Sequence, residues 1–191
     1  MGEAIFSLEE SGKAPTFILI EFPEKLDGSN LTLSEAMLKR LASNASRKKD
    51  GSLGFRSFKL ARSNFLPWDG ISEGDMISRL DGHVEHLRED AGSDQLLFEL
   101  LLGAGFPLNT EYQMVEMAAK QVFSIEDGAL LICLEKEITP ELIDALAEAN
   151  PLQVICLDEG FKGNDQLKAN AVQTFRARAE AEESEIVFRT V

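Results

Sequence analysis

Short apolar runs alternate with amphipathic stretches in the last third of the chain. The apolar runs cover residues 129–134, 153–157 and 185–189, and each has the length of a single strand. Residues 140–149 and 165–179 lie between these runs and carry helical patterns, the first beginning at a proline and the second after an asparagine cap. The pattern predicts the order strand–helix–strand–helix–strand, which builds a small α/β layer with right-handed crossovers.

The hydrophobic pattern in the middle of the chain predicts a helical hairpin and a strand hairpin. Residues 73–89 and 93–102 have helical spacing and are expected to form a helical hairpin, the second helix ending at the glycine pair Gly103 and Gly105. Residues 112–118 and 121–125 are short strand candidates that we expect to pair through a tight turn.

The first part of the chain predicts a second piece of α/β structure. Residues 16–22 are almost continuously apolar, as expected of a strand buried on both faces of a parallel sheet. Residues 31–46 have a helical apolar stripe behind a capping box of Thr32 and Glu35. Residues 55–60 alternate apolar and polar side chains, which predicts a half-buried strand. We place domain boundaries to give residues 1–63, 64–108 and 109–191, with Trp68 in the connector.

Charge is unevenly distributed along this 191-residue chain, whose net charge is −14. Residues 39–62 contain eight basic side chains and one acidic one, or +7, so the remainder carries −21. If any segment contacts nucleic acid, it is this one, with Arg47, Lys48 and Lys49 at its centre. The alternative is an ordinary solvated helix face and loop.

Several broad classes do not fit the composition. No run of about 18 apolar residues is present, which argues against a membrane span. The amino-terminal residues lack the order of a signal peptide. The two cysteines fall inside expected strands and do not suggest a disulfide framework, so a reduced, cytoplasmic protein is expected.

Four collinear blocks carry a family resemblance over almost the whole chain. They are residues 16–24, residues 54–68, residues 96–108, and the region from Cys133 and Cys156 through the terminal Phe-Arg-Thr-Val. Together they resemble the C-terminal region of the modification subunit of type III restriction-modification systems. Members of that family are adenine-N6 DNA methyltransferases that use S-adenosylmethionine. The resemblance implies that residues 1–63 are the end of a doubly wound methyltransferase domain, followed by a connector and a C-terminal α/β domain.

The family's catalytic motifs are missing from this sequence. The methyl donor is held there by a Phe-x-Gly-x-Gly loop, and the flipped adenine by an Asp/Asn-Pro-Pro-Tyr/Phe motif. This chain has no Pro-Pro pair, and Gly103-Ala104-Gly105 follows a helical pattern, which indicates a helix cap. By its position in the matching block, Glu21 is implied to accept a hydrogen bond from the donor ribose, with Glu24 as the alternative. No catalytic residue is expected in this chain.

Three further groups have both a chemical and a structural interpretation. His83 and His86 are spaced for one helix face, but a metal site needs further ligands, and a polar helix surface is the alternative. Cys133 and Cys156 are expected side by side on parallel strands as core residues. Asp158 and Glu159 follow a strand, where α/β sheets bind ligands, although a simple helix-entry loop is the alternative. No metal is predicted.

Three functions compete on these observations. The resemblance implies the C-terminal part of a type III adenine-N6 DNA methyltransferase, inactive alone, that completes the donor-binding sheet and docks subunits. Its implied partners are DNA, a second modification subunit and the ATP-dependent restriction subunit. The alternative is a stand-alone protein-interaction module derived from that region. An independent enzyme acting through Asp158 and Glu159 is the third, and the sequence shows no base or ligand set for it.

Overall fold

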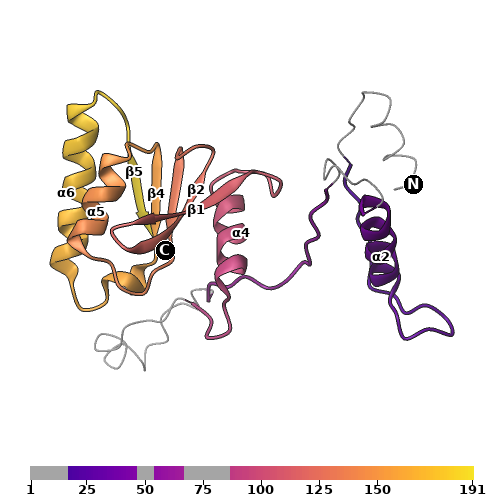
Figure 1. Cartoon of the computed structure of the whole chain (residues 1–191). Helices are drawn as coiled ribbons and strands as arrows, with labels where there is room; N and C mark the ends of the chain where they lie inside the picture. Colours follow the sequence, from indigo (N-terminus) through magenta and orange to yellow (C-terminus); the bar gives the residue numbers. More distant parts are fainter. Residues whose placement is uncertain (1–16, 47–53, 67–86) are drawn as a thin grey trace, which may run out of the picture. The chain divides into compact units, whose positions relative to one another are not determined.

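The computed structural model describes residues 17–46, 54–66 and 87–191 of the chain (Figure 1). These residues belong to two compact units, Met1–Leu60 and Ala61–Val191. The predicted positions Arg47, Lys48 and Lys49, together with Trp68, His83 and His86, lie outside the described residues. In the part of the chain that is described, every helix is too short or too polar to cross a bilayer.

The second unit is an α/β fold built on a mixed five-stranded sheet in the order β1-β2-β3-β4-β5. Its strands are β1 (Tyr112–Met117), β2 (Lys120–Ile125), β3 (Leu130–Cys133), β4 (Gln153–Cys156) and β5 (Val187–Thr190). Strand β2 is antiparallel to both β1 and β3, whereas β3, β4 and β5 are parallel to one another. The predicted strand hairpin and the strand–helix–strand–helix–strand order are both confirmed.

Helices cover both faces of this sheet (Figure 1). One face packs against α5 (Pro140–Glu148) and α6 (Asp165–Ala181), and the other packs against α4 (Ser93–Gly103). Alternation along β3 explains the two cores, because Leu131 and Cys133 point toward α5 and α6 while Leu130 and Ile132 point toward α4. Strand β3, which has apolar residues at every position, is therefore buried on both faces, as its continuous apolar sequence predicts.

Local capping signals set where these helices begin and end. The Thr139 hydroxyl accepts from the Leu142 N–H before Pro140, and the Asn164 side chain accepts from the Leu167 N–H at the start of α6. At the end of α4, Gly105 has a φ of +89°. The Phe106 and Gly105 N–H groups there donate to the carbonyls of Leu101 and Leu102, which confirms the predicted glycine cap.

The first unit contains α2 (Leu33–Ala45), whose predicted capping box between Thr32 and Glu35 is present. The strand predicted for residues 16–22 is wrong over its described part, because residues 17–22 belong to no strand. Ile18, Ile20 and Phe22 are 85%, 87% and 76% exposed. A buried strand needs sheet neighbours on both sides, and the described residues of this unit provide none.

Two other predictions differ from the structure. Residues 55–60 form no strand and are mostly exposed, because an alternating pattern needs a partner strand to become half-buried structure. The expected helical hairpin before the sheet is described only in its second helix, α4. Only residues 87–89 of the first predicted helix are described, and they are not helical. Leu87 instead forms an isolated antiparallel bridge with Phe65.

Candidate functional site

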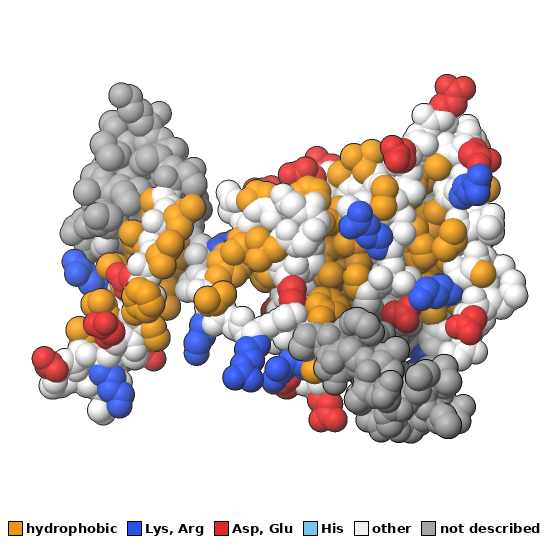
Figure 2. All heavy atoms as spheres, turned by 180° about the vertical axis from the view of Figure 1, so that it is seen from behind, with side chains coloured by type: hydrophobic (Ala, Val, Ile, Leu, Met, Phe, Trp, Pro, Cys, Tyr) orange, Lys and Arg blue, Asp and Glu red, His pale blue; other side chains and the backbone are white. Residues whose placement is uncertain are grey.

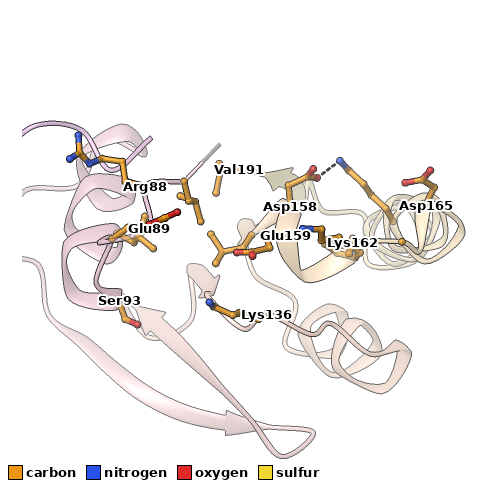
Figure 3. A pocket seen from close by; sticks show the side chains of 16 residues that line it. Arg88, Glu89, Ser93, Lys136, Asp158, Glu159, Lys162, Asp165 and Val191 are labelled. Carbon is orange, nitrogen blue, oxygen red and sulfur yellow. Dashed lines mark hydrogen bonds and ion pairs between the residues drawn. The ribbon is translucent and has the colours of Figure 1, made fainter. Parts of the chain in front are cut away.

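A cleft of about 540 Å³ lies at the carboxyl ends of the parallel strands of the second unit (Figure 3). One wall is the segment just before α4, which supplies Arg88 and Glu89, and the other is the short 3-10 helix η1 (Asp158–Phe161). Lys136, from the loop after β3, and Val191, at the end of β5, complete it. This is the edge of an α/β sheet where ligands usually bind, and where the sequence placed Asp158 and Glu159.

The charges lining the cleft are balanced. Four side chains are basic and four are acidic; they are Arg88, Lys136, Lys162, Lys168, Glu89, Asp158, Glu159 and Asp165. Asp158 accepts from the Lys168 ammonium, so one acid and one base already satisfy each other. Such a surface suits contacts with polar groups of either sign and does not select strongly for an anion or a cation.

Backbone packing explains why the segment of η1 contains a glycine at position 160. The Gly160 carbonyl accepts from the Ile138 N–H at 2.9 Å, which brings η1 close to the loop after β3. A Cβ atom on Gly160 would lie 2.7 Å from Ile138 Cγ1 and 2.8 Å from the Glu135 carbonyl oxygen. The Asp158 N–H also donates to the Val191 carbonyl at 2.7 Å. The helix-entry interpretation of this segment therefore accounts for its glycine.

Cys133 and Cys156 lie directly opposite each other on the parallel strands β3 and β4, as predicted. Both are free and fully buried in the core beneath α5 and α6. The hydrogen bond between the two thiols, together with burial, raises the pKa of Cys156 well above its ordinary value. The same hydrogen bond lowers the pKa of Cys133, but neither thiol has access to solvent, so this pair acts as core packing.

The two acids predicted to contact a methyl donor differ in their surroundings. One carboxylate oxygen of Glu21 is buried and has no hydrogen-bond partner among the described residues. Glu24 is exposed, and its main-chain carbonyl accepts from the Leu33 N–H at 2.8 Å. A buried acceptor without a donor is costly, so Glu21 is held in a less favourable environment than the exposed Glu24.

Glu99 on α4 is a residue whose role the sequence did not reveal, because there it only interrupts an apolar run. Its carboxylate accepts from the Ser63 hydroxyl, and from the Asn64 N–H and side-chain amide at 2.8 and 2.7 Å. Burial alone raises the pKa of Glu99, but these hydrogen bonds outweigh burial and hold it below the ordinary value of 4.5. Glu99 thus fixes the incoming segment of the second unit against α4.

The described residues contain no cluster of three or more His, Cys, Asp or Glu side chains placed to hold a metal. No known family model matches the sequence, and no curated protein is significantly similar to it.

Proposed function

We propose that this chain is the C-terminal part of an adenine-N6 DNA methyltransferase of the type III restriction-modification kind. In this role it completes the sheet that holds the methyl donor and docks partner subunits, while the chemistry of methyl transfer takes place on residues of the methyltransferase's own catalytic motifs. The support begins with the four collinear blocks that resemble the modification subunit.

The observation that carries the proposal is the exposed apolar segment of the first unit. Ile18, Ile20 and Phe22 face solvent, and Figure 2 shows hydrophobic side chains gathered on that unit. Three large exposed apolar side chains in one short segment mark an interaction surface. Apolar side chains at these alternating positions would be buried best by neighbouring strands, and a doubly wound methyltransferase sheet offers these on both sides.

S-adenosylmethionine is the donor that this proposal implies, and Glu21 fits its ribose. The buried, unpartnered carboxylate oxygen of Glu21 is an acceptor that a ribose hydroxyl would satisfy. Bound there, S-adenosylmethionine would supply the methyl group. The contribution of this chain would be to orient the ribose through Glu21 and to exclude water with its apolar neighbours.

The test is complementation of methyl transfer. The chain is mixed with a methyltransferase fragment from the same genome that carries the glycine loop and the Asp/Asn-Pro-Pro-Tyr/Phe motif. Transfer of a labelled methyl group to adenine in DNA is then measured. We expect transfer only when both polypeptides are present, and loss of at least tenfold with Ile20→Asp, because burying a charge in a central strand is strongly unfavourable. Leu152→Asp, at an exposed apolar residue of the second unit, is the matched control and should leave transfer unchanged.

The alternative function is a stand-alone interaction module, and one observation favours it. The second unit buries both faces of its sheet under its own helices, so its core needs no other polypeptide. Under this alternative, the chain binds partners but never stimulates methyl transfer. If the chain and the motif-bearing fragment neither associate nor methylate DNA together, the methyltransferase proposal is wrong and this alternative replaces it.

A further inference from the structure

A shallow groove of about 570 Å³ runs between α6 and the edge strand β5. Its floor is apolar and contains Phe175, Ala179 and Phe188, with the rings of Phe175 and Phe188 stacked at 4.8 Å between centroids. Val172 lines the groove from α6 and is 48% exposed. Phe175 is itself buried, whereas Val172, Ala179 and Phe188 are only partly covered by the unit's own elements.

The strand beside this groove has an open edge. The Val187 N–H donates to the Leu152 carbonyl and the Val191 N–H donates to the Cys156 carbonyl, so these residues face β4. Main-chain groups alternate in direction along a strand, which turns those of Phe188 and Thr190 away from β4. Within the described part of the chain no strand pairs with that side of β5. Its only charged side chain is Arg189, and Pro or Lys residues that commonly protect an edge are missing from β5.

The rim of the groove is acidic. Glu180 is paired with Arg176 at 3.1 Å, whereas Glu183 and Glu185 form no ion pair within the described residues. The whole chain carries −14, so a second copy would bring the same repelling charge to this edge. A partner with basic residues is favoured electrostatically, and nucleic acid is disfavoured.

From these three features we infer that the β5 edge and the α6 groove together bind an extended segment of a partner protein as a sixth strand. That segment would place apolar side chains at every second position over Val172 and Ala179, beside the partly exposed Phe188. It would also hydrogen-bond to the main chain of Phe188 and Thr190, and carry Lys or Arg at its ends. The β5 edge and the α6 groove would be the docking surface of the proposed function, and in that respect the inference rests on it.

A designed peptide probes the site directly on the full-length chain. The probe is a fluorescein-labelled peptide in which three valines alternate with threonines between two pairs of lysines. We expect a saturable rise in anisotropy that is lost when prolines replace a valine and the neighbouring threonine, because main-chain donors alternate in direction and one of two neighbours must face β5. Replacing the lysines with glutamates should weaken binding at low salt by at least tenfold.

Substitutions in the chain locate the bound peptide. Val172→Glu should weaken binding by at least tenfold, because it puts a charge into the apolar groove. Thr190→Pro should weaken it on the order of tenfold, because it removes one outward N–H donor without touching the bonds to β4. Met114→Glu, at an exposed residue on the other edge strand, is the matched control and should bind normally. Circular dichroism checks that each variant is folded, and hydrogen exchange should slow at the Phe188 and Thr190 amides on binding.

Several results would overturn the inference. Among them are the absence of peptide binding, binding unaffected by both Val172→Glu and Thr190→Pro, and loss of binding with Met114→Glu. Self-association of the chain through the same edge would identify a second copy as the occupant instead. The proposed function is judged separately by complementation: methyl transfer restored without peptide binding rejects the sixth strand alone, and peptide binding without methyl transfer rejects the methyltransferase role alone.

Discussion

At the scale of single residues, Gly160 is the position where sequence and packing are most tightly connected. Because an added Cβ would contact both Ile138 and the Glu135 carbonyl, Gly160→Ala should lower the free energy of unfolding by about 1–3 kcal/mol. Urea denaturation measures this change. The control is Gly103→Ala, at a helical glycine with nothing near its Cβ position, which should raise stability by up to about 1 kcal/mol. Equal effects from the two substitutions would contradict the packing argument.

Glu99 predicts a pH dependence with a definite sign. Its hydrogen bonds hold the folded-state pKa below the ordinary value of 4.5, so it contributes stability at neutral pH that persists down to about that value. This contribution is lost as the pH falls through the lower, folded-state pKa. Chemical denaturation between pH 7 and 3 should therefore show a loss of stability that is smaller in Glu99→Gln than in the parent chain. Identical pH profiles for the two proteins would mean that the carboxylate is not held as described.

At the scale of elements, the β1–β2 hairpin has a turn that its residues do not favour. Ala118 and Ala119 have φ values of +48° and +60°, a left-handed conformation that is strained for alanine. Replacing them with Asn and Gly, respectively, which suit this two-residue turn, should raise the free energy of unfolding by about 1–2 kcal/mol. Thermal and urea unfolding of the double variant provide the measurement. A neutral or destabilising result would show that the turn adopts another conformation.

The elements also show what sequence patterns can predict. Strands β3 and β4 and helices α5 and α6 were predictable because apolar runs, caps and a helix-starting proline agree locally. The fold buries these strands on both faces and each helix on one face. The segment of residues 17–22 was mispredicted by the same rule, since a continuous apolar run predicts burial without stating which strands provide it. The cleft at the strand ends followed from topology, but Glu99 did not, because its partners Ser63 and Asn64 are distant in sequence.

At the scale of the whole molecule, the two units differ in how they bury apolar surface. The second unit has two closed cores on the faces of one sheet, whereas the first leaves Ile18, Ile20 and Phe22 in solvent. This contrast, on the proposed function, separates a self-sufficient docking unit from a segment that needs partner strands. On the proposed function, association with a methyltransferase sheet would protect residues 17–22 from hydrogen exchange and leave the second unit's core unchanged.

On the proposed function, the uneven distribution of charge along the chain predicts how salt acts on DNA binding by the assembled enzyme. Residues 39–62 carry +7 while the rest of the chain carries −21, so contacts with phosphate should fall in that segment. Replacing Lys48 and Lys49 with glutamate should weaken DNA binding and flatten the plot of log affinity against log salt, by about 0.9 for each phosphate that the variant no longer neutralises. Lys136→Glu with Lys162→Glu makes the same change of charge in the cleft of the second unit and should leave the slope unaltered. An unchanged slope in the Lys48 and Lys49 variant would place the DNA-binding surface elsewhere, and the basic segment would then be a solvated surface whose charge does not serve phosphate binding.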